Sequence, residues 1–233
     1  MRTLVIGDMH GCFNALVTLL DLVQPNSEDR LITLGDYVDR GPQSREVLDQ
    51  LIDLYTAGQL IPLRGNHDEM MWLSRYHREE RRLWLRFGGV QTLESYGHHP
   101  SEVEYSRVPE RHWDFLEHNL LDFYETERHL FAHASILPDV PLAEQGREVL
   151  LWKRLIGPVA HCSGKTLICG HTRQDTGYPL DLGTVICIDT AIYEEHGWLT
   201  CLDVESGTFW QANQVGEKRV SSLEHLPQLR ASL

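Results

Sequence analysis

The stretch Gly35-Asp36-Tyr37-Val38-Asp39-Arg40-Gly41 places two carboxylates and a guanidinium in one turn, directly after the short apolar run Leu31-Ile32-Thr33-Leu34. The apolar run predicts a buried strand, and Gly35 lets the chain turn where that strand ends. Asp36 would then lie at the carboxyl end of the strand, which is where α/β sheets bind ligands. Two acidic side chains and an arginine at such an end indicate a site for metal ions and phosphate.

Two other stretches repeat this order of strand, turn and helix. Residues 2–6 lead into Gly7-Asp8-Met9-His10-Gly11, and residues 60–63 lead into Arg64-Gly65-Asn66-His67-Asp68. Three consecutive units of this kind predict a parallel sheet with right-handed crossovers, so that all three turns emerge at one edge. The polar residues of the turns are therefore expected to converge: Asp8, His10, Asp36, Asn66 and His67.

Further strands in the second half of the chain deliver more histidines. Residues 130–134 are apolar apart from His133, and residues 166–169 end in Gly170-His171. Residues 185–188 end in Asp189, and residues 199–204 and 208–212 are typical of an antiparallel hairpin. The predicted fold is α/β, with a mostly parallel sheet from the first half facing a mixed or antiparallel sheet from the second. Helices over both outer faces would make a four-layer α/β/β/α sandwich.

The remaining segments predict helices and a tail. Residues 68–87 are expected to form one helix with an apolar side and an opposite arginine side, which is either an ion-paired surface or a basic wall that guides substrate. Short helices are expected at residues 90–96 and after Pro109, and His98-His99-Pro100 is expected to be a loop. We expect one catalytic domain over residues 1–213 and a polar, irregular tail over residues 214–233.

Composition narrows the class of protein. The formal net charge of -13 over 233 residues argues against a general nucleic-acid binder, which needs a basic face. No secretory signal or bilayer-spanning apolar stretch is apparent, so a soluble cytoplasmic protein is expected. The five cysteines are an odd number without CxxC spacing and indicate reduced, buried thiols.

The polar residues at the strand ends have the chemistry of metal ligands. Asp8 and His10 would point to the same side of an extended segment, within reach of one ion. Oxygen and imidazole ligands together favour manganese, iron or zinc over calcium or magnesium. Six candidate ligands divide into two metal sites that share Asp36: Asp8, His10, Asp36, Asn66, His133 and His171. The two ions would lie about 3.5 to 4 Å apart, as is typical of two-metal hydrolases. Taken alone, a histidine in an apolar strand such as His133 is more often a core residue.

Together these motifs resemble the phosphoprotein phosphatase branch of the calcineurin-like metallophosphoesterases, including bacterial serine/threonine phosphatases and the bacteriophage lambda phosphatase. The matching stretches are residues 7–11, 35–41 and 65–68, His133 and Gly170-His171. The resemblance implies two divalent ions. Manganese is the expected metal, with iron or zinc as alternatives. The first ion would be bound by Asp8 and His10, Asp36 would bridge, and the second ion would be bound by three residues: Asn66, His133 and His171.

The resemblance also implies roles in catalysis. A hydroxide bridging the two ions would attack phosphorus in line. Arg40 and Arg154 would clamp the phosphate oxygens, although Lys153, Arg147 or Arg173 are alternatives to Arg154. His67 would be the general acid for the leaving oxygen, oriented by Asp39.

The expected function is a metal-dependent phosphomonoesterase of the protein serine/threonine phosphatase type. The alternative is a hydrolase of dinucleoside polyphosphates, such as diadenosine tetraphosphate, or of RNA 5'-caps, since those enzymes resemble this family too. They typically carry a small residue where this chain has Asp39, which favours the monoesterase. A binding module without catalysis is a third hypothesis. Expected partners are phosphorylated proteins or small phosphoesters, with no stable nucleic-acid complex, no membrane, and a monomer or simple homo-oligomer.

Overall fold

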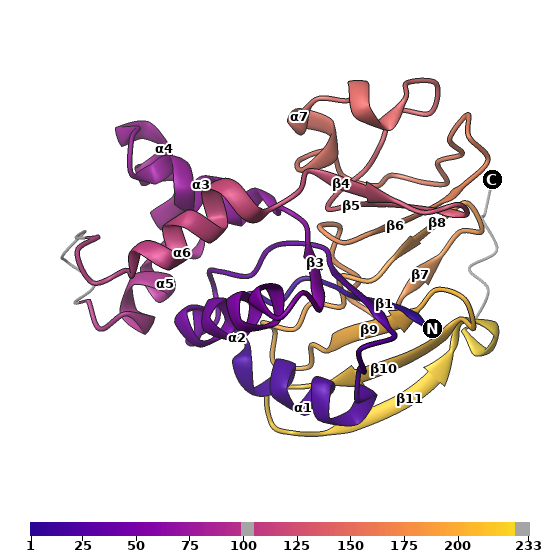
Figure 1. The fold of residues 1–233 in the computed structure, drawn as a ribbon, viewed down its shortest axis with the longest axis horizontal. Coiled ribbons are helices and arrows are strands. Elements are labelled where there is room, and N and C mark those ends of the chain that lie inside the picture. Colours follow the sequence, from indigo (N-terminus) through magenta and orange to yellow (C-terminus); the bar gives the residue numbers. More distant parts are fainter. Residues whose placement is uncertain (99–104, 227–233) are drawn as a thin grey trace.

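In the computed structural model of the protein, which describes residues 1–98 and 105–226, two mixed sheets face each other (Figure 1). The first has the order β11-β10-β9-β1-β2-β3 and the second β4-β5-β6-β8-β7. The strands of the first sheet are β1 (Thr3–Ile6), β2 (Arg30–Thr33), β3 (Leu60–Pro62), β9 (Leu199–Asp203), β10 (Thr208–Ala212) and β11 (Lys218–Ser222). Those of the second are β4 (Phe123–Glu125), β5 (His129–Ala132), β6 (Thr166–Cys169), β7 (Leu180–Asp181) and β8 (Val185–Cys187). The predicted α/β fold with two facing mixed sheets is confirmed.

Helices cover the outer faces of both sheets, as predicted. The first sheet is covered by α1 (Phe13–Val23) and α2 (Ser44–Thr56). The second is covered by the short α7 (Arg147–Leu150), a 3-10 turn at Leu142–Glu144 and irregular segments. Figure 1 shows α1 and α2 below the sandwich and α7 above it.

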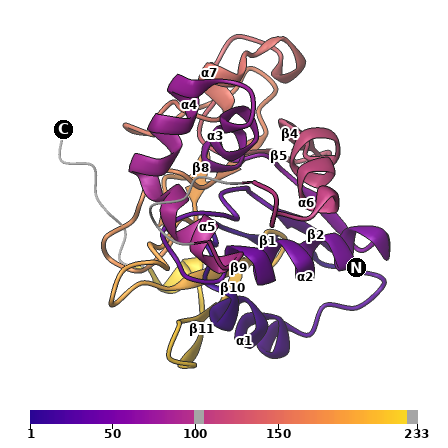
Figure 2. The same ribbon diagram turned by 90° about the vertical axis from the view of Figure 1, so that its left-hand side faces the viewer.

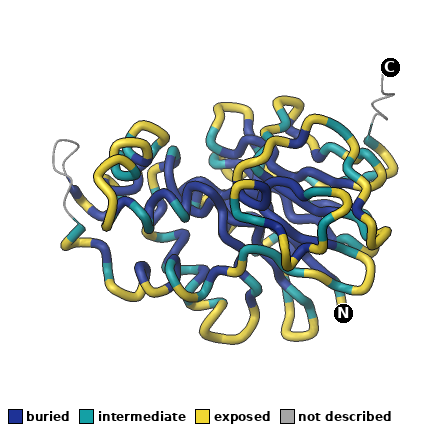
Figure 3. Tube along the Cα trace, turned by 90° about the horizontal axis from the view of Figure 1, so that it is seen from above, coloured by how far each residue is buried: buried dark blue, intermediate teal, exposed yellow. Residues whose placement is uncertain are grey.

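Side chains alternate between the inner and outer faces of the first sheet. The parallel register of β1 and β2 pairs Leu4 with Leu31 and Val5 with Ile32. Successive residues of a strand point to opposite faces, so Leu4 and Leu31 pack against the helices. Val5 and Ile32 instead pack against Ile168 of the second sheet. These inner side chains form the buried layer between the sheets, visible as the dark-blue centre of Figure 3.

Strand direction sets the place of the polar turns. The strands β1, β2 and β3 are mutually parallel in the first sheet, and β5, β6 and β8 are mutually parallel in the second. The predicted parallel arrangement of the first three strands is therefore confirmed. Each of these six strands ends in a turn that carries a polar residue.

The carboxyl-terminal strands differ from the prediction in their place and extent. The hairpin of β9 and β10 forms as expected, but β9 pairs antiparallel with β1 and so extends the first sheet rather than the second. The irregular tail predicted from residue 214 is wrong for residues 218–225, which form β11 and a 3-10 turn. The strand β11 is a half-exposed edge strand and consists mostly of polar residues. Its sequence therefore lacks the apolar pattern that predicts a strand. The rest of the predicted tail, residues 227–233, lies outside the described residues.

The helix predicted over residues 68–87 is broken into several pieces. The structure has α3 (Asn66–Ser74), α4 (Arg78–Trp84), a π-helical turn (Leu85–Gly89) and α5 (Val90–Ser95). Together with α6 (Glu110–Asp114) and a π-helical turn at Phe115–Asn119, they form a helical arm at one end of the sandwich (Figures 1 and 2). The break occurs at His77, whose backbone is extended with φ −123° and ψ 118°.

The break changes which side chains of the helical arm are buried. Tyr76, Leu83 and Phe87 of the predicted apolar side are exposed, whereas Met71 and Trp84 are buried. The chain turns back after α3, so that Trp84 reaches the interior. The tryptophans Trp84 and Trp113 both belong to the core of this chain.

Four smaller expectations can be compared with the structure. The arginine side of the arm is ion-paired in part, since Arg82 lies 3.0 Å from Glu79. Four of the cysteines are buried, but Cys162 is exposed, which corrects the prediction for that residue. Of the predicted loop at residues 98–100, the last two residues lie outside the described ranges. Among the helices of residues 1–98 and 105–226, none is both long and apolar enough to cross a membrane.

Tyr37 anchors the turn around Asp36, and its removal is predicted to destabilise the fold. The buried hydroxyl donates to the carbonyl of Leu63 at 2.5 Å and lies 2.8 Å from the hydroxyl of Thr33. Tyr37→Phe would leave both groups buried without this partner, so the free energy of unfolding should fall by about 1 to 3 kcal/mol. Urea denaturation measures the change. The control Tyr55→Phe removes a partly exposed hydroxyl and should shift it by less than about 0.5 kcal/mol; equal shifts would contradict the anchoring role.

Candidate active site

Six parallel strands bring polar side chains to one region beside a cavity of about 570 Å³. Those strands come from both sheets, so the site lies where the carboxyl ends of the two sheets meet. The residues that follow the strands are Asp8 and His10 after β1, Asp36, Asp39 and Arg40 after β2, Asn66 and His67 after β3, His133 after β5, His171 after β6 and Asp189 after β8.

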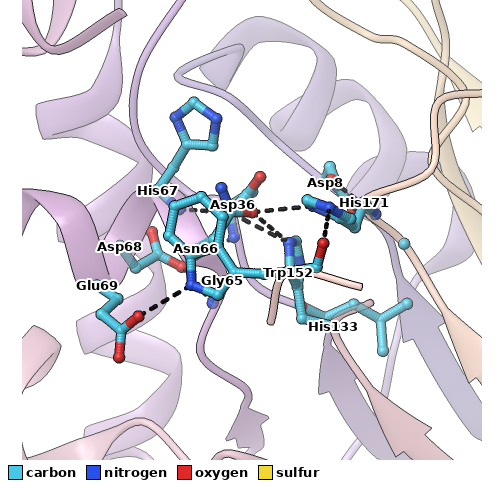
Figure 4. A network of polar contacts seen from close by, with 12 residues as sticks. Asp8, Asp36, Gly65, Asn66, His67, Asp68, Glu69, His133, Trp152 and His171 are labelled. Atoms are coloured by element: carbon cyan, nitrogen blue, oxygen red, sulfur yellow. Dashed lines mark hydrogen bonds and ion pairs between the residues drawn. The ribbon is translucent and has the colours of Figure 1, made fainter. Parts of the chain in front are cut away.

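Asp36 lies at the centre of this region, and each of its oxygens faces a different histidine. Its Oδ2 is 3.5 Å from His10 Nε2, and its Oδ1 is 3.5 Å from His133 Nε2. The amide oxygen of Asn66 lies 2.9 Å from His133 Nε2 and 3.0 Å from His171 Nδ1 (Figure 4). Two groups of ligand atoms therefore share Asp36. The structure thus brings five of the six predicted ligands together. Asp8 lines the same cavity but belongs to neither group, and the first group contains His67 instead. The binding of metal stays a prediction.

Two of the histidines are held in the orientation that metal ligands need. His10 Nδ1 lies 3.0 Å from the carbonyl of Val38, and His133 Nδ1 lies 2.9 Å from the carbonyl of Leu34. A carbonyl only accepts, so Nδ1 carries the proton in both rings. In a neutral ring Nε2 then keeps its lone pair, and at His133 this lone pair faces another acceptor, the amide oxygen of Asn66. Burial lowers the pKa of His10 and of His133, which favours the neutral form of both imidazoles.

Two carboxylates of the site, those of Asp8 and Asp189, are buried close to other acids. Burial, with the nearby carboxylates of Asp189 and Asp36, raises the pKa of Asp8 well above its ordinary value. Burial raises the pKa of Asp189 to about 6. Buried acids placed this close together are stabilised by a bound cation. With the neutral imidazoles, they form a mixed oxygen and nitrogen donor set that fits manganese, iron or zinc.

His67 stands apart from the other imidazoles. Its Nδ1 lies 2.7 Å from Asp39 Oδ2 and its Nε2 lies 3.1 Å from the guanidinium of Arg40. Figure 4 shows the ring turned away from His133 and His171, which follow β5 and β6. Burial lowers the pKa of His67, but the carboxylates of Asp36 and Asp39 outweigh it and raise the pKa overall. The ring suits a proton donor, although its nitrogen also lies within 4.8 Å of ligand atoms of His10 and Asp36, so a ligand role competes.

Backbone strain is concentrated in the same turns. Five residues of the site have a left-handed backbone, which side-chain-bearing residues rarely adopt. Their φ values are 42° for His10, 53° for Asp36, 75° for Asp39, 69° for Arg40 and 58° for His171. Strain of this kind persists only where the surrounding structure holds it, and it clusters at functional sites.

The candidates for the second phosphate-binding residue differ in where they lie. Arg154 lines the cavity, is exposed, and forms no ion pair within residues 1–98 and 105–226. Arg173 also lines the cavity, but it lies 2.6 Å from Glu194. Arg147 and Lys153 are absent from the described lining. This placement favours Arg154 over the other three candidates, and the binding of phosphate by Arg154 and Arg40 stays a prediction.

Arg40 brings an aromatic residue into the site that sequence reasoning missed. Its guanidinium carbon lies 4.3 Å from the ring centre of Tyr193, and its Nη1 lies 2.8 Å from His10 Nε2. Trp84 and Thr92, which both contact Asp39, were missed as well. Each sits in an irregular or broken segment with no motif around it. Asp189 did carry a signal, because it follows a strand in the same way as the predicted ligands.

The chain is similar to several known proteins. A symmetrical bis(5'-nucleosyl)-tetraphosphatase of Nitrosomonas europaea is 32% identical over 140 residues, which cover 60% of this chain and 46% of that protein. The protein of the same name from Coxiella burnetii is 34% identical over 145 residues, covering 61% and 45%. These matches span somewhat less than half the length of either relative.

A solved structure supports the fold, and a sequence pattern identifies the family. A solved structure described as a candidate diadenosine tetraphosphatase has a TM-score of 0.62 and 20% identity, covering 95% of this chain and 93% of that chain, and so supports the fold. The sequence pattern of the calcineurin-like phosphoesterases matches residues 1–175. That match covers most of the chain and includes the turns that build the site. This chain therefore belongs to the calcineurin-like phosphoesterase family.

Proposed function

We propose that the chain is a metal-dependent hydrolase that cleaves the phosphoanhydride of dinucleoside polyphosphates, with diadenosine tetraphosphate as the reference substrate. Both sequence relatives described above are named as symmetrical bis(5'-nucleosyl)-tetraphosphatases. Their names favour the alternative reading of the sequence over the protein phosphatase that the turn around Asp39 suggested. Asp39 is therefore weaker evidence for a monoesterase than its place in the motif suggested.

The observation that carries this proposal is the mixed lining of the cavity. Phe87 and Trp152 line it with partly exposed aromatic rings, beside the exposed guanidinium of Arg154. Stacking of a nucleobase on an aromatic side chain contributes about 1 to 3 kcal/mol. A cavity of about 570 Å³ that joins such rings to arginines and to the carboxylate and imidazole centre suits a nucleotide with several phosphates.

The six predicted ligands would hold two divalent ions, manganese first. When bound, such ions lower the pKa of water and stabilise charge that develops on phosphoryl oxygens. The guanidinium groups of Arg40 and Arg154 would bind phosphate oxygens, which their planar pairs of donors fit. His67, oriented by its hydrogen bond to Asp39, would give a proton to the leaving oxygen.

A phosphomonoesterase acting on phosphoserine or phosphothreonine is the second candidate. The observation that favours it is the buried hydrogen bond of 2.7 Å between Asp39 and His67. A nucleoside diphosphate leaves readily as an anion, whereas a serine alkoxide needs a proton. A built proton donor is therefore more useful to a monoesterase than to an anhydride hydrolase.

Turnover of a substrate panel tests the proposal. With the full chain and manganese, kcat/KM for diadenosine tetraphosphate should exceed that for a phosphoserine peptide by at least about tenfold, because base stacking adds binding. The products should be adenosine diphosphate alone if cleavage is symmetrical, as chromatography would show. A 5'-capped RNA tests the related anhydride. A preference for the peptide would replace the proposal with the second candidate.

Asp36→Asn tests the sharing of one carboxylate between two ions. The substitution weakens both groups of ligand atoms, so metal content and kcat should fall together and further than after any other single ligand change. Metal analysis by mass spectrometry after gel filtration, with turnover of p-nitrophenyl phosphate, measures both. The control Asp175→Asn changes an exposed carboxylate at the cavity wall and should leave two ions bound. An Asp36→Asn protein that keeps two ions and near-normal turnover would disprove the sharing.

His67→Asn separates the general acid from a ligand. A serine alkoxide needs a proton and p-nitrophenolate does not, so kcat on a phosphoserine peptide should fall by about 10² to 10⁴ and on p-nitrophenyl phosphate much less. Metal content should stay unchanged. Pre-steady-state bursts check that bond cleavage limits both reactions. Equal losses on the two substrates would rule out the acid role, and loss of an ion would make His67 a ligand.

A further inference from the structure

Asp39 has both carboxylate oxygens engaged in the protein interior. Its side chain is fully buried, and Oδ2 accepts the hydrogen bond from His67. The other oxygen, Oδ1, accepts from the indole Nε1 of Trp84 at 2.8 Å and from the hydroxyl of Thr92 at 2.8 Å. A buried carboxylate oxygen without donors is costly, so these two groups decide how the carboxylate sits.

The same part of the helical arm also holds the backbone at Asp39. The N–H of Asp39 donates to the hydroxyl of Thr92 at 2.8 Å, and the N–H of Arg40 lies 3.4 Å from the carbonyl of Gly88. A side chain at Gly88 has no room, because a Cβ there would lie 2.7 Å from the nitrogen of Arg40. Both residues of this turn have the strained, left-handed backbone noted above. Residues 84–92 therefore hold the strained turn of Asp39 and Arg40 from one side, and we call this segment the clasp.

The clasp belongs to the helical arm rather than to the strand ends that build the rest of the site. Trp84 ends α4, Thr92 lies in α5, and the turn Leu85–Gly89, which is kinked at Gly88 with φ 123° and ψ 2°, joins them. Phe87, in the middle of this turn, lines the cavity. One short segment thus contacts both the substrate cavity and the carboxylate behind the general acid.

We propose that Trp84 and Thr92 are positioning residues: they fix the carboxylate of Asp39 so that its second oxygen orients the imidazole of His67 towards the leaving oxygen. This inference rests on the proposed hydrolase function. Neither residue is among the described residues that line the cavity, so their effect would reach the reaction only through His67. A merely structural role for the same residues would lower stability without changing how the enzyme treats different leaving groups.

Variants that remove one donor at a time test the proposal. Thr92→Val and Trp84→Phe each remove one donor to Asp39 Oδ1, and Thr92→Ser restores the hydroxyl. The control Trp113→Phe changes another buried tryptophan that packs against Tyr105. We expect each donor variant to lose about 5- to 50-fold in kcat on phenyl phosphate, and less than about threefold on p-nitrophenyl phosphate. Thr92→Ser and Trp113→Phe should keep the leaving-group dependence of the original protein.

The loss of kcat caused by the donor variants should also disappear when His67 is replaced. In a His67→Asn background, Thr92→Val should cause no further loss, because both changes act on one step. Equal losses on the two substrates, or losses that multiply in that background, would overturn the proposal. If Trp84→Phe fails to fold, Thr92→Val, which keeps the side-chain volume, carries the test.

A second readout does not depend on turnover. The Nδ1 proton of His67, hydrogen-bonded to a carboxylate, should give a downfield NMR signal that His67→Asn removes. Thr92→Val should weaken or shift this signal, and Thr92→Ser should keep it. An unchanged signal in Thr92→Val would overturn the proposal. Absent turnover of every phosphate substrate by the original protein would instead refute the proposed function, and the signal would still decide the positioning role.

Discussion

The site depends on the carboxylate of Asp68, which is not one of the predicted metal ligands. Asp68 accepts three backbone hydrogen bonds: from Gly65 at 2.9 Å, from Asp36 at 2.8 Å and from Tyr37 at 3.0 Å. These bonds tie the turn after β3 to the turn after β2. The N–H of His67 closes the connection by donating to Asp36 Oδ1 at 3.0 Å. Because a buried carboxylate with three donors has little freedom, the distances around Asp36 follow from this contact.

Much of the site was predictable because parallel strands carry their following turns to one edge. The positions of Asp8, Asp36 and His171 follow from apolar runs that end in glycine and a polar residue, without knowledge of the packing. The partners of β1 were not predictable in this way. The hairpin of β9 and β10 would have the same sequence pattern in either sheet. Which sheet it joins depends on the pairing of β9 with Val5 and its neighbours, far away in the sequence. The edge strand β11 is too polar to show an apolar face.

The helical arm shows where local patterns fail. Apolar side chains at helical spacing predicted one amphipathic helix, but burial follows the polar requirement of Asp39. The indole of Trp84 is inside because its N–H has a carboxylate to bind, while Phe87 is left at the cavity wall. Function was harder still to read. The same ligands and the same Asp39–His67 pair suit cleavage of an ester or an anhydride, and the difference lies in side chains such as Trp152 that no motif marks.

We propose that Asp36 is shared between two metal ions, with His67 bound to neither. Anomalous diffraction at the manganese edge, from crystals grown with manganese, would locate the ions. Two peaks are expected, one beside His10 Nε2 and one beside His133 and His171, with the carboxylate of Asp36 between them. A single peak, or a peak bound to the imidazole of His67, would contradict it.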